Sequence, residues 1–360
     1  MSATPDGQPV FEGDLMRDPG GRLLITAIVV DFNGGSRLDE ALASLFAQRA
    51  VTVEVILVDN GSTDGAAARA HERYGDQLTY IRNSTNLGFA AANNQAFERA
   101  RGEWIVLLNN DAVADSNALA ALMKAAASSP DIGMLACRVV MYDQPHVFDS
   151  AGLLVYPDGV CRARGWEEKD LGQYDRTEEV LGPHGAAAAY RRTMVEKIGL
   201  FDPAYFAYLE DLDLALRAQL AGWRCLYVPE AVVRHRKSST FGNYSRFKAY
   251  HVERNRIYAA VKLLPRFLLL VSPLYTLNRY LMQFYAARRH LGISSEFVKE
   301  YSWLELFFIL LRAYSAGLVR LPVLLRQRRR IAASRTISKE EWYRLFSRFK
   351  LDAIELALKF

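Results

Sequence analysis

Short apolar runs alternate with amphipathic, helix-like segments through the first third of the chain. The run at 23–30 is almost entirely apolar, the run at 53–59 is apolar apart from Glu54 and Asp59, and both are rich in β-branched residues, which is typical of strands buried on both faces. Between them, residues 36–48 repeat leucine and phenylalanine with helical spacing. Further strands follow at 78–83 and 103–111, each preceded by a helical segment. This alternation predicts β-α-β units and a doubly wound, mostly parallel sheet with helices on both faces.

The pattern becomes less regular after one more helix and strand. Residues 142–180 carry scattered charge and glycine, and we interpret them as an inserted loop or small sheet. A helix within 208–223 and a strand at 225–235 follow. We therefore expect an α/β domain over residues 23–242.

Polar residues cluster where the predicted strands end. The clusters are Asp31 with Asn33, Asp59 to Asp64, Asn83 to Asn86, and Asn109 to Asp111. Such residues are common in ordinary turns. However, the carboxyl ends of parallel strands meet at one edge of a sheet, which is where ligands bind in these folds. Four clusters on one edge favour a binding site.

Several classes of protein are disfavoured by missing motifs. No Gly-x-Gly-x-x-Gly follows the first strand, and no P-loop is present, which argues against a dinucleotide-dependent dehydrogenase or an ordinary kinase. The three cysteines, Cys137, Cys161 and Cys225, lie far apart, so neither a disulfide framework nor a cysteine zinc site is expected. This usage fits a reducing compartment.

The two ends of the chain differ in character. Residues 1–22 are polar, contain several Gly and Pro, and lack the apolar core of a signal peptide, so we expect a disordered, cytosolic N-terminus. Residues 234–360 hold 25 Lys and Arg against 8 Asp and Glu, a net charge of +17, whereas residues 1–233 hold 20 against 32, a net charge of −12. A basic tail on an acidic body indicates two regions with different partners.

The tail, residues 243–360, combines this charge with apolar runs at 263–277 and 303–325. The first run is too short to span a membrane, and charged residues interrupt the second. We expect basic amphipathic helices that lie in the membrane surface, helped by the cluster RQRRR at 326–330. Packing onto the α/β domain, or a homodimer formed through these helices, are the alternatives. No nucleic-acid-binding motif accompanies the charge.

Seven motifs in order carry a family resemblance over residues 23–260: VVDFNGG, VILVDNGSTDG, NLGFAAANNQA, GEWIVLLNND, GAAAAYRR, GLFDPAYFAYLEDLDLALRAQLAGW and VVRH. Together they resemble the inverting glycosyltransferases of family 2, especially the rhamnosyltransferase-like branch. The resemblance implies a GT-A fold, in which one doubly wound sheet binds a nucleotide-sugar and a divalent cation. The Gln-x-x-Arg-Trp motif of processive members is absent, which favours transfer of a single sugar.

The resemblance also implies roles for particular residues. Asp111 and His235 are expected to hold Mg²⁺ or Mn²⁺. In the pair Glu210-Asp211, Asp211 is expected to act as the general base that takes the proton of the acceptor hydroxyl, and Glu210 as an orienting group. Asp213 is excluded because it has an ion-pair partner four residues along the helix.

The donor site is expected to include Asn33, Asp59, Asn86, Asn94, Asn110 and Arg191. In the family, the residue at the position of Asp59 accepts a hydrogen bond from the N3–H of uracil or thymine. Arg191 is expected to pair with a phosphate.

The sequence thus predicts an inverting glycosyltransferase on the cytoplasmic face of the cell membrane. It would move one sugar, rhamnose from a dTDP- or UDP-type donor, to a lipid-linked or growing glycan acceptor in cell-envelope polysaccharide synthesis. Two alternatives remain open, namely a nucleotidyltransferase on a similar sheet and an inactive nucleotide-sugar-binding scaffold.

Overall fold

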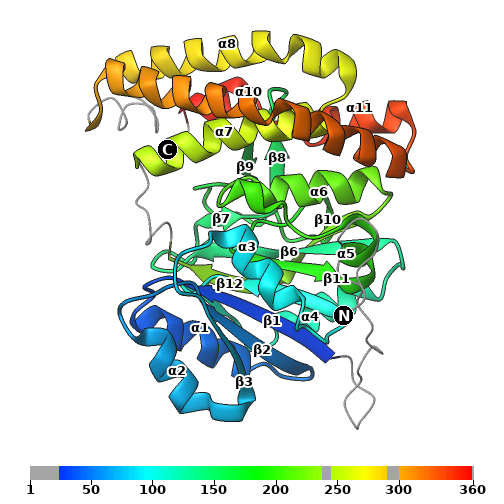
Figure 1. Ribbon diagram of the computed structural model, residues 1–360. Helices are drawn as coiled ribbons and strands as arrows, with labels where there is room; N and C mark the ends of the chain where they lie inside the picture. The colour runs from blue at the N-terminus through cyan, green and yellow to red at the C-terminus, as the bar shows by residue number, and fades with distance from the viewer. Residues whose placement is uncertain (1–23, 237–244, 290–299, 359–360) are drawn as a thin grey trace.

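The computed structural model describes residues 24–236, 245–289 and 300–358, and it confirms the predicted α/β architecture with a helical tail (Figure 1). The predicted N-terminal segment, 1–22, lies outside the described residues. The strands are β1 (Leu24–Asp31), β2 (Thr52–Asp59), β3 (Leu78–Arg82), β4 (Trp104–Leu108), β5 (Ala112–Ala114), β6 (Ile132–Met141), β7 (Phe148–Ser150), β8 (Leu153–Val155), β9 (Cys161–Ala163), β10 (Glu178–Val180), β11 (Ala187–Arg191) and β12 (Arg224–His235).

Helices surround the sheet and form the tail. They are α1 (Ser36–Phe46), α2 (Ala66–Tyr74), α3 (Phe89–Phe97), α4 (Ala118–Ala126), α5 (Arg192–Ile198), α6 (Glu210–Leu220), α7 (Arg246–Leu263), α8 (Arg266–Arg288), α10 (Trp303–Ser334), α11 (Lys339–Arg348) and α12 (Ala353–Leu358). Two short 3-10 helices, η1 (Gly75–Gln77) and η2 (Pro203–Tyr205), lie in the connections.

The main sheet has the strand order β10-β12-β6-β11-β4-β1-β2-β3. Strands β4, β1, β2 and β3 run parallel, and Asp31 lies directly opposite Asp59 at their carboxyl ends, as the sequence predicts. Strand β11 enters antiparallel between β4 and β6. The sequence pattern does not reveal β11, because its residues are mostly alanine and lack the β-branched side chains of the other central strands.

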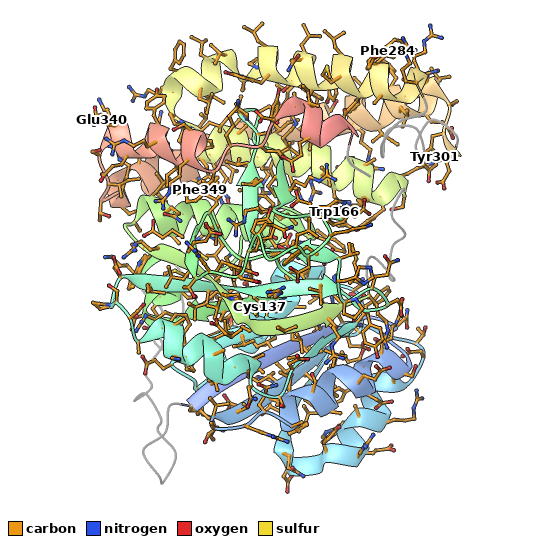
Figure 2. All side chains as sticks on the ribbon, turned by 180° about the vertical axis from the view of Figure 1, so that it is seen from behind. Cys137, Trp166, Phe284, Tyr301, Glu340 and Phe349 are labelled. Carbon is orange, nitrogen blue, oxygen red and sulfur yellow. The ribbon has the colours of Figure 1, made fainter. Side chains whose placement is uncertain are left out.

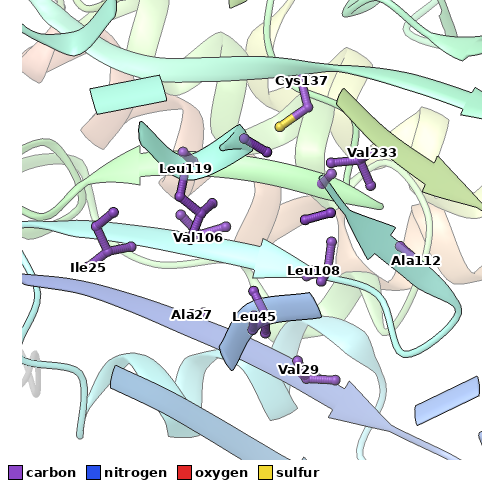
Figure 3. Close-up of a cluster of buried hydrophobic side chains, with 14 of the residues drawn as sticks. Ile25, Ala27, Val29, Leu45, Val106, Leu108, Ala112, Leu119, Cys137 and Val233 are labelled. Atoms are coloured by element: carbon purple, nitrogen blue, oxygen red, sulfur yellow. The ribbon is translucent and has the colours of Figure 1, made fainter. Parts of the chain in front are cut away.

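The core forms two layers, one on each face of this sheet. Alternate residues of β1, namely Ile25, Ala27 and Val29, join the layer under α1, α2 and α4, part of which Figure 3 shows. Ile28 faces the opposite layer, which α3, α5 and α6 cover. Burial of both faces explains why the strand is apolar at nearly every position.

The tail helices pack directly on α6 (Figure 1). The predicted leucine stripe of α6 is confirmed, since Leu209, Leu212, Leu216 and Leu220 are all buried. These leucines share a core cluster with Tyr258, Leu263 and other residues of the tail. The boundary expected near residue 242 therefore separates two sequence patterns, while the packing is continuous across it.

A buried charge network joins the same two helices. Asp213 of α6 has no exposed surface, and its carboxylate lies 2.8 Å from Arg217 Nε and 2.6 Å from Lys262 Nζ of α7. The Asp202 carboxylate also contacts Lys262, at 2.9 Å. The pair with Arg217 matches the sequence prediction, whereas Lys262 comes from the tail. Removing one partner from a buried charge costs about 3–5 kcal/mol, so this network holds α7 against α6.

A second buried cluster links α7 to α8 and to the inserted strands. Arg279 of α8 lies 2.7 Å from Glu253 of α7 and 2.8 Å from Asp158, in the turn between β8 and β9. Arg256 contacts Glu253 at 3.0 Å and donates a hydrogen bond to the hydroxyl of Tyr314 in α10. Burial opposes ionisation of Glu253, but Arg279 and Arg256 outweigh it and lower the pKa of Glu253 to about 2.

Helix α10 is long and apolar enough to cross a membrane, by length and composition, and no other helix within the described ranges meets that test. It nevertheless runs along α7 and is bonded to the body. Gln327 donates to the Asp202 carboxylate at 3.0 Å, and Arg328 donates to the Val261 carbonyl at 2.9 Å. Beyond the helix, the Thr336 N–H donates to the Leu220 carbonyl at 2.9 Å. These contacts favour a helix lying on the protein surface.

Candidate active site

A cavity of about 960 Å³ opens at the carboxyl ends of the parallel strands. Asn60, Asn86, Asn110 and Asp111 line it from the ends of β2, β3 and β4. Further lining residues are Glu210 and Asp211 at the start of α6 and His235 at the end of β12. From there the cavity continues beneath the tail helices. Most of the residues predicted from separate motifs therefore meet at one place.

Asp31 ties three of the strand-end loops together. It is fully buried, and its carboxylate accepts hydrogen bonds from Asn110 Nδ2 at 2.6 Å and from the Ser62 hydroxyl at 3.1 Å. Burial raises its pKa above the usual range. Asp31 thus has a structural role beneath the cavity, and it fixes the orientation of the lining residue Asn110.

Side-chain amides form a second network at the neighbouring strand ends. Asn60 Nδ2 donates to Asn86 Oδ1 at 2.9 Å, and Asn83 Nδ2 donates to Asn60 Oδ1 at 3.1 Å. The Asn86 oxygen also accepts the N–H of Gly88 at 2.9 Å. Gly88 has φ +86°, and a Cβ there would lie 2.6 Å from the Phe206 carbonyl, so only glycine fits. Asn60 lines the cavity beside the predicted Asn86. The only sequence signal for Asn60 is its position at the end of a predicted strand.

Asp59, the last residue of β2, and Asn33, in the loop after β1, are each next in sequence to a residue that lines the cavity. The Asp59 carboxylate accepts hydrogen bonds from the Ser62 N–H at 2.8 Å and from the Tyr80 hydroxyl at 3.0 Å. Asn33 adopts φ 56° and accepts the Thr63 N–H at 2.8 Å. Both residues brace the β1 and β2 loops in this structure.

Two predicted donor-binding residues lie elsewhere. Asn94 donates its amide to the Phe201 carbonyl at 2.8 Å and does not line the cavity. Arg191 pairs with Trp104 at the amino end of β4, because β11 runs antiparallel to β4, and its Nε donates to the Ile132 carbonyl at 2.8 Å. Arg191 therefore lies at the opposite edge of the sheet from the cavity. We remove both residues from the proposed donor site.

Asp111 and His235 meet although 124 positions separate them in sequence. The short strand β5, which the pattern does not predict, pairs with the end of β12 and places Ala112 opposite His235. As a result, Asp111 Oδ1 lies 3.2 Å from His235 Nε2. The other ring nitrogen, Nδ1, lies 2.7 Å from Asp149 Oδ2. Asp149 is in β7, inside the irregular stretch 142–180, and no motif signalled it.

This group favours positive charge. Burial disfavours the imidazolium form of His235, but Asp149 and Asp111 outweigh burial and raise the pKa of His235 to about 10. A divalent cation beside Asp111 would take the place of the proton on Nε2. A carboxylate on the far nitrogen of a metal-binding histidine is the usual means of orienting the ring.

The donor atoms of Asp111 and His235 fit adjacent positions on a hard cation. Ligands about 2.1 Å from an octahedral ion lie about 3 Å apart, close to the 3.2 Å between Asp111 Oδ1 and His235 Nε2. In the described part of the chain, no group of three or more His, Cys, Asp or Glu could hold a metal alone. The protein thus offers a partial site of the kind that substrate phosphates complete.

Glu210 and Asp211 differ in their surroundings. Asp211 accepts hydrogen bonds from the Gly185 N–H at 3.1 Å and the Leu212 N–H at 2.8 Å, which stabilise a carboxylate. Within the described residues, Oε2 of Glu210 has no hydrogen-bond partner. Burial, and then the charge of Asp211, raise the pKa of Glu210 well above its usual range. We infer that Glu210 is the member of the pair that retains a proton.

The turn that leads into α6 has an unfavourable backbone conformation. Phe206, Tyr208 and Leu209 have φ values of 64°, 71° and 65°, each in the left-handed region. Such residues cost about 1–3 kcal/mol apiece unless the surroundings impose the conformation. Here the fully buried Asn255 of α7 directs its amide nitrogen to three carbonyl oxygens of the turn, at 2.7, 2.8 and 2.9 Å. The tail therefore helps to aim the carboxylate pair.

Comparison with known proteins gives the family. The model described as "Glycosyltransferase like family 2" matches residues 21–259, and the chain belongs to that family. The similarity is to the rhamnosyltransferase-like branch, as the sequence motifs predict. The chain is 30% identical over 260 residues to the N-acetylglucosaminyl-diphospho-decaprenol L-rhamnosyltransferase of Mycobacterium tuberculosis, and the match covers 63% of this chain and 81% of the relative.

Two further similarities agree with this placement. The chain is 28% identical over 223 residues to an O-antigen chain rhamnosyltransferase of Salmonella typhimurium, covering 60% of this chain and 67% of the relative. Its fold resembles a mannosyltransferase from Pyrobaculum calidifontis solved with GDP-mannose and Mn²⁺, with a TM-score of 0.50, 21% identity, and coverage of 87% and 90% of the two chains. The predicted GT-A fold is confirmed.

The raised pKa of Glu210 makes a prediction about stability. The folded protein retains the Glu210 proton to a higher pH than the unfolded chain does, so wild type loses stability as pH rises above the ordinary value of 4.5. Glu210→Gln does not titrate and should gain melting temperature relative to wild type as pH rises above about 5. Glu72→Gln, on an exposed part of α2, is the control. If melting temperature changes with pH in the same way in all three proteins, the raised pKa of Glu210 is contradicted.

Proposed function

We propose that the protein is an inverting glycosyltransferase that moves a single sugar, rhamnose from a dTDP- or UDP-linked donor. The acceptor is a lipid-linked or growing glycan in cell-envelope synthesis. Family membership supports glycosyl transfer, and the names of the mycobacterial and Salmonella relatives support the sugar, the lipid-linked acceptor and the pathway class. The observation that carries the proposal is that Asp211 lines the same cavity as Asp111 and His235.

The two ends of this arrangement suit the two halves of the reaction. A sugar hydroxyl is a weak nucleophile, so Asp211 accepts its proton as the oxygen attacks the anomeric carbon. The bond to the nucleoside diphosphate breaks on the opposite side, which inverts the configuration. Glu210, in its protonated form, adds no second negative charge beside the base and has a hydrogen to donate to the acceptor.

Asp111 and His235 Nε2 are the residues that would hold Mg²⁺ or Mn²⁺. When bound, the cation neutralises charge on the diphosphate leaving group. Asp149 orients the His235 ring for this purpose. Asn60, Asn86 and Asn110 offer amide groups to the donor at the neighbouring strand ends. Asp59 remains the proposed hydrogen-bond partner of the uracil or thymine ring of the donor.

Donor binding should depend on the cation and on Asp111. Asp111→Ala should weaken the binding of dTDP or UDP measured calorimetrically with Mn²⁺, and the chelator EDTA should have the same effect on wild type. Asp143→Ala, an exposed aspartate outside the cavity, should bind as wild type does. Equal affinity with and without EDTA, in wild type and Asp111→Ala alike, would exclude a metal role.

The base assignment is tested by replacing each carboxylate in turn. Asp211→Asn should bind the donor normally and lose about 10²–10⁴-fold in transfer rate, because a positioned base contributes that much. Glu210→Gln should lose far less, since glutamine resembles the protonated acid. Sugar transfer is measured from the rate of nucleoside diphosphate release with acceptor present. A dead Glu210→Gln enzyme beside an active Asp211→Asn enzyme would move the base to Glu210.

We also propose that the tail places the enzyme on the inner face of the cell membrane. Large apolar side chains on α8 and α10 are exposed, among them Leu270 at 76% and Leu318 at 71%. Contiguous exposed apolar surface of this kind indicates an interaction site. Arg326, Arg329 and Arg330 are also exposed on α10, where they suit anionic lipid headgroups.

Liposome flotation tests the membrane proposal. Wild type should float with anionic liposomes and dissociate in high salt. The triple change of Arg326, Arg329 and Arg330 to Gln should weaken flotation, since each basic residue contributes about 1 kcal/mol at an anionic surface. The matching triple change of Arg69, Arg73 and Arg99 to Gln, on α2 and beyond α3, should not. A wild-type dimer in buffer that never floats would favour a second copy on these faces.

A further inference from the structure

The cavity extends well past the carboxylate pair. Its far part is lined by Leu281, Phe284 and Ala287 of α8 and by Trp303, Leu306 and Leu310 of α10. The amides and carboxylates of the strand ends thus give way to alkyl and aromatic side chains. A nucleotide-sugar is polar over nearly all its length and would gain little from these walls. This part of the cavity suits a hydrocarbon.

The apolar part opens to the outside of the molecule. Leu281, Phe284 and Trp303 line the cavity, yet they are 58%, 47% and 52% exposed, so they stand at its mouth. Figure 2 shows Phe284 on the outermost tail helix, whereas Trp166, another lining residue, lies between the tail helices and the sheet. A chain entering between α8 and α10 would therefore lead toward the strand ends.

The mouth lies among the exposed apolar faces of the same two helices. On α8, the exposed residues Phe267, Leu270, Leu274 and Leu277 continue the stripe that reaches Leu281 and Phe284, with spacings of three and four. On α10, Leu304, Phe308, Leu311 and Leu318 form the corresponding face. A membrane that covers both faces would bring its hydrocarbon region against the opening.

Lys248 and Arg162 are among the charged residues that line the cavity. Lys248 of α7 lies 5.7 Å from the ring centre of Tyr208, two residues before Glu210. Arg162 of β9 lies 5.7 Å from the ring centre of Trp166. These two positive groups are complementary to a diphosphate that joins a sugar to its lipid. The order of a lipid-linked acceptor, with hydrocarbon outermost and sugar innermost, matches the change in cavity lining.

We infer that the space between α8 and α10 receives the hydrocarbon chain of a diphosphate-linked acceptor, which enters directly from the membrane. This inference rests on the proposed function in one respect, namely that the acceptor is lipid-linked. The tail then selects the acceptor by its hydrocarbon chain in addition to attaching the enzyme to the bilayer.

Calorimetry on the full chain tests the inference with two probes that share a head group. Geranylgeranyl diphosphate, below its micelle concentration, should bind at least about tenfold more tightly than isopentenyl diphosphate, because each buried methylene contributes about fourfold. The shared diphosphate cancels any binding of the head group at the donor site.

Substitutions inside and outside the cavity test where the longer hydrocarbon chain binds. Leu306→Gln, inside the cavity, should remove most of the preference for the longer chain, whereas Leu318→Gln, on the outer face of the same helix, should keep it. Ala287→Trp, which fills the same space, provides a second test if Leu306→Gln melts early. Equal affinity for the two probes in wild type, or equal effects of the Leu306 and Leu318 changes, would overturn the inference.

A transfer assay separates this inference from the proposed function. Chain-dependent binding without transfer to any lipid-linked sugar would leave the hydrocarbon site standing and remove the proposed acceptor. Transfer that proceeds equally with long-chain and short-chain acceptors, together with equal probe affinities, would remove the hydrocarbon site and leave the transferase.

Discussion

Asp213 is a charged group with no exposed surface, and much of the architecture follows from how it is neutralised. Arg217 supplies one partner from the same helix, and Lys262 supplies the other from α7. The attraction of these cations outweighs burial and lowers the pKa of Asp213. Because an unpaired buried charge is so costly, α6 adopts its place only with α7 beside it. The tail is consequently part of the catalytic body.

The division of charge within the cavity follows the same physical rule. Carboxylates crowded into a buried space do not all ionise readily, and burial and then the charge of Asp211 raise the pKa of Glu210. Asp111 and Asp149 instead share a positive partner, His235, in the structure as described. The two ends of the cavity thus differ, with a hydrogen-bonded carboxylate, Asp211, at one end and carboxylates paired with a histidine at the other.

The sequence predicts those parts of the structure that depend on local pattern. Strands β1 and β2 are predicted by runs of mostly apolar, β-branched residues. The strand-end clusters converge because the carboxyl ends of parallel strands lie at the same edge of the sheet. The pair of Asp213 with Arg217 follows from helical spacing alone. The roles of Asp111, His235 and Asp211 came from family resemblance, which encodes three-dimensional proximity that no local pattern contains.

The remainder depends on contacts between distant segments. Arg191 follows an alanine run that has no clear strand pattern, so the sequence predicts neither β11 nor its antiparallel direction. That direction places Arg191 at the amino end of β4, away from the cavity. Asp149 lies in a stretch without periodicity, and Asn255 occupies a helix whose turn partners are about 50 residues away. Single-segment reasoning has no access to such pairings.

The left-handed turn held by Asn255 also bears on how the enzyme comes into being. A ribosome releases the α/β body first, and folding generally proceeds from the N-terminal side during synthesis. At that stage the chain has Phe206, Tyr208 and Leu209 but not the amide that fixes their conformation. The α/β body therefore lacks a correctly placed carboxylate pair until α7 has been synthesised. Its carboxylate pair is aimed only once α7 has emerged and docked, which delays sugar transfer until the first tail helix is in place.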